Sequence, residues 1–435
     1  MNEDNQTEAA SEAPMPSSVD VVVIGAGIAG LCAALTAAER GARVLVVDAH
    51  EPGGRASTAT RNGFHLNVGA HGLYRGGHLT RILAAHGREP AGGIVSSSSI
   101  GVLLDGTVHH LAMNALGIIR NPVLRPKSRV RMAALFARMP RMKTAALTGR
   151  SVSDWLGDEP EDLQRFMEMF IRLSAYTHAP DQFDAGAAAG QLQMALKGVR
   201  YVDGGWIRLV ESLRQLALAA GAMVVGHAEV TRVESSTNRN EVYVGEHCIS
   251  ASTVVIAAGG PDAAARLTGA SVKASGNLTQ PVAASCLDLG LRRAHTGLVL
   301  GMDESVYLSP HAPLADLAPA GHGLVTVMRY LAPGESAGEP AAAKAQLCDV
   351  ARRCGIADDD IVMERALHRM VVTHGAPTAA GGGLAGRPSI GALGLRGVFV
   401  AGDWVGPSGL IGDASAASGE QSGIAAAALC ASIVR

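Results

Sequence analysis

A glycine-rich turn between two apolar runs constrains the fold of this chain more strongly than any other feature. Residues 21–24 are continuously apolar and short enough for a strand that is buried on both faces. Gly25, Gly27 and Gly30 follow in the spacing G-x-G-x-x-G. The first glycine permits a tight turn, the second lets the backbone approach a pyrophosphate, and the third lets the next helix lie close to the sheet. The pattern therefore predicts a phosphate-binding turn between a strand and a helix.

The helix after this turn should start at Ile28 and Ala29, where unpaired N–H groups and the helix dipole favour a negatively charged phosphate. A second apolar run at residues 44–47 predicts the next strand. It ends at Asp48 and Ala49, about twenty residues beyond the glycine turn, where a carboxylate can accept the hydroxyls of an adenosine ribose. Because an acid there disfavours a 2′-phosphate, the segment predicts FAD or NAD rather than NADP.

The residues after Asp48 separate FAD from NAD. Gly53, Gly54 and Arg55 form a second glycine motif, and residues 63–74 read GFHLNVGAHGLY. Both resemble a signature of the FAD-dependent amine oxidase and phytoene desaturase superfamily, which also includes protoporphyrinogen oxidases. In that superfamily a GGR lies near the pyrophosphate, so the resemblance implies that Arg55 pairs with phosphate as a fixed positive charge.

Residues 64–68 alternate apolar and polar side chains, which predicts a half-buried strand. In the superfamily such a strand ends beside the flavin ring, which would place Gly69, Ala70 and His71 at the cofactor. His71 is the first candidate for a catalytic base or a substrate contact, and a histidine hydrogen-bonded within the core is the alternative. Tyr74 is a second catalytic candidate because it could line the same cavity.

The C-terminal block also resembles the superfamily. Residues 397–403 read GVFVAGD, a strand that ends in Gly-Asp, and residues 413–434 predict a helix of small residues. In the superfamily the Asp meets the ribityl and pyrophosphate region, and the helix starts at the pyrimidine edge of the flavin, where its positive end stabilises the reduced ring. An N-cap is the alternative role for Asp413. The cofactor-binding residues implied here are Gly402, Asp403, Gly412, Asp413 and Ala414.

Two central segments also concern the cofactor. A glycine pair at residues 201–206 precedes a predicted helix, and by resemblance the strand after that helix passes the adenine and places Val230 there. A later strand would bring Ala258 to the same site. Residues 381–386 also match G-x-G-x-x-G, but no second strand with a ribose-binding acid follows, so we expect a loop and no site for NAD.

These motifs predict an α/β chain with a Rossmann-like FAD-binding domain and a discontinuous α+β substrate domain. Its length of 435 residues, with 48% hydrophobic residues, is enough for two cores. The expected division is a disordered tail at 1–18, an FAD-binding domain at 19–105, 200–274 and 391–435, and a substrate domain at 106–199 and 275–390.

Composition excludes several other classes of protein. The net charge of −2 gives no global attraction to nucleic acid. Six cysteines without C-x-x-C pairs argue against a metal site or a disulfide scaffold and favour a reducing cytoplasm. No stretch approaches the roughly 18 to 20 apolar residues of a membrane span, and residues 1–18 hold no Lys or Arg, unlike an export signal. Abundant Ala and Gly suggest a bacterial source, and the oligomeric state stays open.

Residues 107–153 differ in character because they contain nine Lys or Arg, several Met and Leu, and no Asp or Glu. Three interpretations stay open. The segment lies on an anionic membrane surface, or it is the solvated face of a helical insert over the substrate cavity, or it attracts an anionic substrate. Pro122, Pro126 and Pro140 interrupt the helical spacing, which weakens the membrane interpretation.

The resemblance implies hydride transfer from a substrate carbon to flavin N5. Amine oxidases with covalent flavin carry a cysteine shortly before the C-terminal motif, whereas residues 386–396 contain none, so we expect noncovalent FAD. Aromatic residues make up 3% of the chain and none pairs with Trp404, which leaves little material for an amine cage. We therefore expect phytoene desaturase-like dehydrogenation of a C–C bond in a hydrophobic substrate. The alternatives are oxidation of a C–N bond by an amine oxidase and non-catalytic isoprenoid binding, as in the Rab escort and GDP-dissociation inhibitor proteins.

Overall fold

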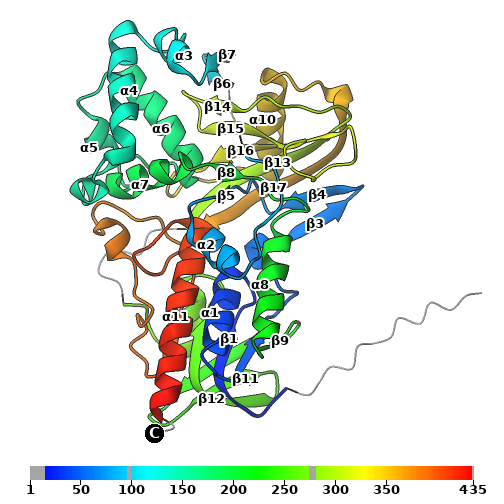
Figure 1. The fold of residues 1–435 in the computed structure, drawn as a ribbon. Coiled ribbons are helices and arrows are strands. Elements are labelled where there is room, and N and C mark those ends of the chain that lie inside the picture. The colour runs from blue at the N-terminus through cyan, green and yellow to red at the C-terminus, as the bar shows by residue number, and fades with distance from the viewer. Residues whose placement is uncertain (1–14, 96–98, 274–280, 434–435) are drawn as a thin grey trace, which may run out of the picture.

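Two seven-stranded sheets organise the chain in the computed structural model, which describes residues 15–95, 99–273 and 281–433 (Figure 1). The first sheet consists of β1 (Ser18–Ile24), β2 (Val44–Val47), β9 (Met223–Val225), β10 (Val230–Ser235), β11 (Asn240–Val244), β12 (His247–Ile256) and β18 (Val398–Val400). Its strand order is β10-β11-β12-β1-β2-β9, and β18 pairs with β12. β1 lies parallel to both β2 and β12, which confirms the α/β fold class.

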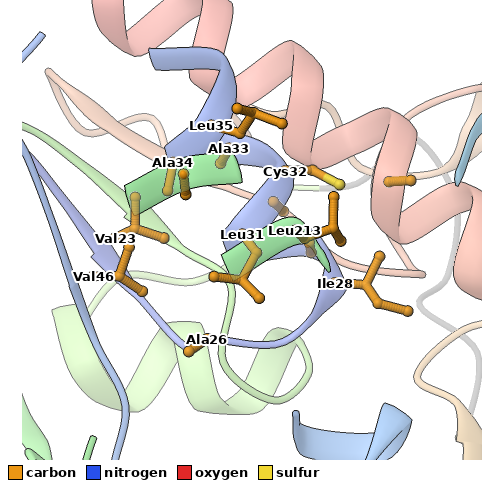
Figure 2. Packing of buried hydrophobic residues seen from close by; sticks show 14 of the residues in the cluster. Val23, Ala26, Ile28, Leu31, Cys32, Ala33, Ala34, Leu35, Val46 and Leu213 are labelled. Atoms are coloured by element: carbon orange, nitrogen blue, oxygen red, sulfur yellow. The ribbon is translucent and has the colours of Figure 1, made fainter. Parts of the chain in front are cut away.

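β1 and β2 are buried on both faces, as their continuous apolar runs predict. Val21 and Val23 face one hydrophobic cluster, and Val22 and Ile24 face another on the opposite side of the sheet. Side chains alternate between the faces of a strand, so a strand covered on both faces needs apolar residues at every position. Figure 2 shows the first cluster, in which Val23 and Val46 of the sheet pack beneath the helix that follows the glycine turn.

Three helices cover that face of the first sheet: α1 (Ile28–Ala38), α8 (Ile207–Ala219) and α11 (Ile411–Ile433). α1 lies between the other two (Figure 1). A Cβ on Gly419 would lie 2.2 Å from the Ala29 oxygen, and one on Gly423 would lie 2.4 Å from the Ala33 oxygen. The small residues of α11 therefore allow it to approach the backbone of α1 closely.

The second sheet consists of β6 (Ser99–Leu104), β7 (Thr107–Ala112), β13 (Val282–Leu291), β14 (Val299–Gly301), β15 (Val306–Ala312), β16 (Gly323–Tyr330) and β17 (Ile361–Thr373). Its order is β17-β13-β16-β15-β14-β6-β7. β6 pairs with β7 and β14, so residues 99–104 lie in this sheet, whereas the division expected at residue 105 places them with the first sheet. The hairpin at Gly106 keeps both strands together, and sequence periodicity does not report which sheet a hairpin joins.

Helices lie on both faces of the second sheet. α10 (Pro340–Arg353) covers one face through Leu347 and Val350. The other face meets a helical layer formed by α3 (Ala115–Ile119), α4 (Pro126–Arg138), α5 (Val152–Leu156), α6 (Glu161–Ala175) and α7 (Ala185–Ala195). α5 and α6 are separate helices, and Pro160 forms the N-cap of α6.

Shorter elements connect these layers. They include two two-stranded ladders, β3 (Thr58–Arg61) with β4 (Phe64–Asn67) and β5 (Leu73–Tyr74) with β8 (Val199–Arg200), the helices α2 (His78–Ala85) and α9 (Pro261–Thr268), and the 3₁₀ turns η1 (Gly54–Ala56), η2 (Met139–Arg141), η3 (Thr144–Leu147), η4 (Asp358–Asp360) and η5 (Gly383–Gly386). The glycine motif at residues 381–386 thus forms a turn in a loop, as expected.

The tail expected at residues 1–18 lies largely outside the described residues, and β1 already begins at Ser18. In the part of the chain that the structure describes, no helix combines the length and apolar character needed to cross a membrane.

Candidate active site

A long groove of about 880 Å³ begins at the glycine turn after β1. Its volume lies within the range of small-molecule and cofactor sites. Gly25 has a φ of +103°, and a Cβ on Gly30 would lie 1.8 Å from the Gly25 oxygen, so glycine is required at both positions. A Cβ on Gly27 would meet nothing closer than the Gly53 oxygen at 3.8 Å. The turn is therefore tightly packed toward α1 and open toward the groove.

The N-terminus of α1 faces this groove. Gly27 is the N-cap, no described side chain caps the helix, and its first turn contains no acidic residue. The first N–H groups of a helix have no partner within the helix, and with the helix dipole they attract anions. The floor of the groove thus fits a phosphate group.

Asp48 lies at the end of β2 and lines the groove together with Ala49. Its Oδ2 accepts the N–H of Ala26 at 2.6 Å, and its Oδ1 accepts the N–H of His50 at 2.9 Å. These bonds fix the carboxylate between the glycine turn and the strand end, and each oxygen retains a lone pair for a further donor. The hydroxyls of a ribose would supply such donors.

Most residues that the sequence assigns to the cofactor come together here. The groove is lined by Gly25, Gly27, Ile28, Ala29, Asp48, Ala49, Gly53, Gly54, Arg55, His71, Val230, Ala258, Gly402, Asp403 and Gly412. Ala70 and Asp413 instead line a second, inner cavity. Gly30, Gly69 and Ala414 line neither, because Gly30 packs beneath the turn, a Cβ on Gly69 would lie 2.5 Å from Met370, and Ala414 is fully buried in α11. Direct contacts of these residues with a cofactor stay predictions.

Arg55 is paired within the protein. Its Nη1 donates to Asp403 Oδ2 at 2.6 Å and to the Val372 oxygen at 2.9 Å. Asp403, which is 1% exposed, also accepts the backbone N–H and Nδ1–H of His374 at 3.2 and 3.3 Å. Burial raises the pKa of Asp403, but Arg55 and His374 outweigh it and hold that pKa well below its usual value. The Arg55 side chain is 37% exposed and lines the groove, so its other N–H groups can still meet an anion.

The inner cavity has a volume of about 50 Å³ and adjoins the groove. The two share part of their lining, including Arg55, His71, Trp206, Ile411 and Gly412. The other walls of the inner cavity are mainly apolar and include Val68, Ala70, Leu73, Leu79, Met370 and Leu410. An apolar group bound in the inner cavity would therefore lie next to the end of the groove.

His71 lies at this junction. Its Nδ1 is 3.0 Å from the Gly69 oxygen, and because a carbonyl can only accept, Nδ1 carries the proton of the neutral ring. Nε2 therefore keeps its lone pair. Burial lowers the pKa of His71 to about 4, so the ring is uncharged at neutral pH. The ring packs edge-on against Trp206 with centroids 4.7 Å apart.

Tyr74 lines the inner cavity, but its hydroxyl is engaged. It donates to the Ser174 oxygen at 2.5 Å, and burial raises the pKa of the phenol. Its proton is therefore not free for a substrate, although its oxygen can still accept a hydrogen bond. Of the two catalytic candidates, His71 has the more available reactive atom.

Asp413 does not cap its own helix in the manner expected of an N-cap residue. Its Oδ1 accepts the N–H of Leu79 at 3.0 Å, and the N–H of His78 also bonds to the carboxyl group, so Asp413 of α11 caps the N-terminus of α2. A Cβ on Gly77 would lie 2.1 Å from this carboxylate. Burial raises the pKa of Asp413 to about 6.

Several lining residues are not evident from the sequence. Trp206 and Arg266 have no motif of their own, although Trp206 directly follows a glycine pair. Arg387 is buried and donates to the oxygens of Asp403, Ser408 and Gly409 at 2.9 to 3.1 Å, which fixes the loop before α11. Burial lowers the pKa of Arg387 to about 10. No local pattern could have indicated these long-range contacts.

Ile411 has a φ of +53° at the start of α11, and it lines both cavities. This conformation is rare for a β-branched residue. Such strain is often found at functional sites.

Comparison with known proteins identifies the class of this site. The family of FAD-dependent oxidoreductases matches residues 20–418, and the chain belongs to this family. It is therefore an oxidoreductase, and its cofactor is FAD. The groove fits this assignment because its glycine turn, free helix N-terminus and fixed carboxylate match the phosphate and ribose of that cofactor.

Among curated proteins, the phytoene dehydrogenase of Streptomyces griseus is 27% identical over 257 residues, which cover half of each chain. The all-trans-retinol 13,14-reductase of Rattus norvegicus is 39% identical over 79 residues, which cover 18% of this chain and 13% of the relative. The chain thus matches half or less of the length of these relatives.

Solved structures share the fold over nearly the whole chain. An oxidoreductase from Methanosarcina mazei is 22% identical with a TM-score of 0.74, and the match covers 93% of this chain and all of the other. Cyclohexylamine oxidase from Brevibacterium oxydans is 18% identical with a TM-score of 0.68, covering 97% of this chain and all of the other. These likenesses cover both sheets and show the fold alone.

Proposed function

We propose that this FAD-dependent oxidoreductase dehydrogenates a C–C bond in an extended apolar substrate of the polyene type. The observation that supports this most directly is the charge of the inner cavity. Its walls are mainly apolar, its cation Arg55 is fixed by Asp403, and its carboxyl group, Asp413, already accepts the first N–H groups of α2. An ammonium ion would find there a cation and a carboxylate that is already hydrogen-bonded, whereas an apolar chain loses nothing on entering.

The partial likeness to a phytoene dehydrogenase and to retinol reductases also favours a polyene. The likeness to an amine oxidase keeps oxidation of a C–N bond as the second candidate.

When bound, FAD supplies the group that accepts the hydride. The N-terminus of α1 would hold its pyrophosphate, Asp48 its ribose, and the residues shared by the two cavities its reactive ring. The apolar walls would orient the substrate and exclude water. His71 Nε2 offers an acceptor for a proton that leaves the substrate, because its Nδ1–H is fixed on Gly69.

We further propose that FAD is bound noncovalently and that the enzyme is bacterial and cytoplasmic. None of the six cysteines lines the groove as described, which supports noncovalent binding. All six cysteines are free, which supports a reducing compartment. Release of intact FAD on denaturation would support noncovalent binding, and flavin retained on the denatured chain would contradict it.

The test of the main proposal is anaerobic bleaching of the oxidised flavin absorbance. Detergent-dispersed polyenes and a panel of primary and secondary amines would each be mixed with the purified FAD-loaded protein. Bleaching by polyenes alone supports the proposal. Bleaching by amines alone contradicts it and favours C–N oxidation, and a colourless protein that cannot be reconstituted with FAD would contradict the cofactor itself.

A further inference from the structure

A buried ion pair lies inside the second sheet, on the face opposite α10. Asp288 of β13 alternates with Leu287 and Leu289, which pack with α10, and it stands directly opposite Arg365 of β17 and Thr326 of β16. Arg365 donates to Asp288 Oδ2 through Nε at 2.9 Å and through Nη2 at 2.6 Å, and Thr326 donates to Oδ1 at 2.7 Å. The Asp288 side chain is 4% exposed and that of Arg365 is 19% exposed.

The attraction between these two charges does not by itself account for the pair. Burial raises the pKa of Asp288, and Arg365 and Thr326 oppose that rise. Two ions lose hydration when they are buried, and apolar residues of similar volume often replace a buried ion pair without loss of stability. A role for this pair is therefore expected in the other hydrogen bonds of Arg365.

Arg365 also holds the end of β4. Its Nη2 donates to the Asn67 oxygen, and its Nη1 donates to the Leu66 oxygen at 3.4 Å. β4 lies against this face of the second sheet, because a Cβ on Gly290 would lie 2.7 Å from the ring of Phe64. The guanidinium thus joins the second sheet to the carbonyl groups at which β4 ends.

A series of hydrogen bonds leads from Asn67 to His71. The Asn67 oxygen also accepts the N–H of Gly69 at 2.9 Å. Gly69 has a φ of +82°, and its own oxygen lies 3.0 Å from His71 Nδ1. The carbonyl group that fixes the proton of His71 on Nδ1 therefore belongs to a turn that Arg365 holds at its first residue.

The side chain of Asn67 fixes Trp206, which packs on His71. Asn67 is 8% exposed, and its Oδ1 accepts the backbone N–H of Trp206 at 2.9 Å and the hydroxyl of Thr58 at 2.8 Å. Thr58 Oγ1 in turn accepts the N–H of Ile207 at 3.1 Å, so the start of α8 is bonded to β3 and β4. Trp206 lines both the groove and the inner cavity, so these bonds determine where its ring stands in them.

We propose that Asp288, Arg365 and Asn67 are positioning residues for the junction of the groove and the inner cavity. The groups that they position are the rings of His71 and Trp206. Asp288 orients the guanidinium, Arg365 fixes the end of β4, and Asn67 bonds the two segments that carry these rings. The linings of the groove and the inner cavity include none of the three positioning residues. This inference rests on the proposed function, because it assumes that the reaction takes place at this junction.

The main test is the double variant Arg365→Met with Asp288→Asn. It removes both charges, so no buried ion is left without a partner and the fold should be retained, but the Asn67 oxygen loses its cationic donor. Arg365→Lys is the second variant, which keeps a charge beside Asp288 but lacks the planar fork that bonds Asp288 and β4 together. Arg353→Met with Glu304→Gln is the matched control, because it removes another ion pair of this domain whose residues are 24 and 34% exposed.

Hydrogen exchange of the FAD-loaded protein without substrate is the first measurement. We expect peptides that cover residues 67–71 to exchange at least tenfold faster in the double variant, as for loss of one hydrogen bond to a charged group. Peptides of β1 and β2 should exchange as in the wild type. Arg365→Lys should give a smaller increase at residues 67–71, and the control pair should give none.

The rate of anaerobic flavin reduction is the second measurement. We expect the double variant to lower the limiting rate at least tenfold, because a small displacement of a reacting group is costly. The substrate concentration that gives half of this rate should stay the same, since the apolar walls of the inner cavity are unchanged. The control pair should alter neither quantity.

Wild-type exchange at residues 67–71 in the double variant would overturn the positioning role, and so would faster exchange with an unchanged rate of reduction. Faster exchange in all peptides would assign the ion pair to general stability instead. Because the exchange measurement needs no substrate, it separates this failure from failure of the proposed function. If amines and not polyenes reduce the flavin, the proposed substrate is wrong, and slower reduction of the double variant by amines still supports the positioning role.

Discussion

His71 is the residue on which the proposed chemistry depends most. Its proton is fixed on Nδ1 by the Gly69 oxygen, and the side chain lines both the groove and the inner cavity. A histidine that only fills the core would need no such free nitrogen. The roles of proton acceptor and of core residue predict different effects on the rate of flavin reduction when the imidazole ring is removed.

We expect His71→Leu to slow anaerobic flavin reduction by about a hundredfold, the lower end for a positioned proton acceptor, while FAD remains bound. Stopped-flow absorbance measures the rate. Because burial lowers the pKa of His71 to about 4, the wild-type rate should lose this contribution only as the pH falls through about 4. His227→Leu is the control, since that histidine is 67% exposed. An unchanged rate in His71→Leu would assign His71 to the core.

Arg55 and Asp403 give a second prediction. Replacing Arg55 by Met leaves a carboxylate that is 1% exposed without its cation. We expect a loss of about 2 kcal/mol in the free energy of unfolding at pH 7, less than for a fully buried pair because Arg55 is 37% exposed. Chemical denaturation of the FAD-free protein measures it.

The loss in Arg55→Met should depend on pH with a defined sign. Arg55 helps to hold the pKa of Asp403 below its unfolded value, so the stabilisation is present above pH 4 and is lost as the pH falls below it. Arg43→Met, which removes an exposed pair with Asp20, is the control and should destabilise the protein less than Arg55→Met. Equal losses in both variants would show that burial of Asp403 has no consequence.

Two secondary-structure elements meet at Asp413. This residue belongs to α11 and bonds the first N–H groups of α2, so it fixes the two helices to one another beside the inner cavity. Burial raises its pKa to about 6. The folded protein therefore holds this proton more tightly than the unfolded chain does, and the contribution of Asp413 to stability falls as the pH rises from about 4 to about 6.

We expect Asp413→Asn to remove this pH dependence. Asn can still accept from α2 through its amide oxygen, but it does not ionise. The difference in melting temperature, variant minus wild type, should increase between pH 4 and pH 6 and stay constant above. Asp162→Asn provides a control with the opposite sign, because that aspartate caps α4 from α6 with a lowered pKa. A difference that does not change with pH would show that Asp413 ionises as it does in the unfolded chain.

At the scale of the whole molecule, exposed apolar and basic side chains lie together on the surface around α3 and α4, which are at the top of Figure 1. Met113, Leu116, Ile119 and Val130 are 39 to 72% exposed there. They lie among the basic residues of 107–153, of which Lys127 and Arg138 are exposed. We propose, as the first interpretation of this segment, that the surface contacts an anionic membrane from which an apolar substrate could enter.

Vesicle sedimentation tests this surface. Binding should be stronger to vesicles with anionic lipid than to neutral ones and should weaken with salt. Lys127→Glu with Arg138→Glu should weaken binding at least tenfold, since each basic residue contributes about 1 kcal/mol. Arg88→Glu with Arg396→Glu reverses exposed charges elsewhere and should have no such effect. Equal binding to neutral vesicles, or no response to the first pair, would favour a solvated insert.

The sequence alone predicted the features that depend on residues close together in the chain. β2 matches its predicted bounds, and the glycines at 25 and 30 are required for the steric reasons expected, because a turn and its flanking helix are set by local sterics and by apolar periodicity. The superfamily motifs correctly indicated the cofactor. β6 pairs with β7 and lies in the second sheet, which the sequence did not indicate, since a hairpin pattern specifies its own pairing and not the sheet that it joins.

Contacts between distant residues could not be predicted in this way. Arg55 meets Asp403 across 348 positions, and Asp413 caps a helix 334 positions away. Strand order and helix packing place such side chains together, and neither produces a periodic pattern in the sequence. The cofactor site is lined by short segments, several of which carry a motif of their own, so it could be predicted from the sequence. Which side chains line the inner cavity was decided only by the packing of the two sheets and their helices.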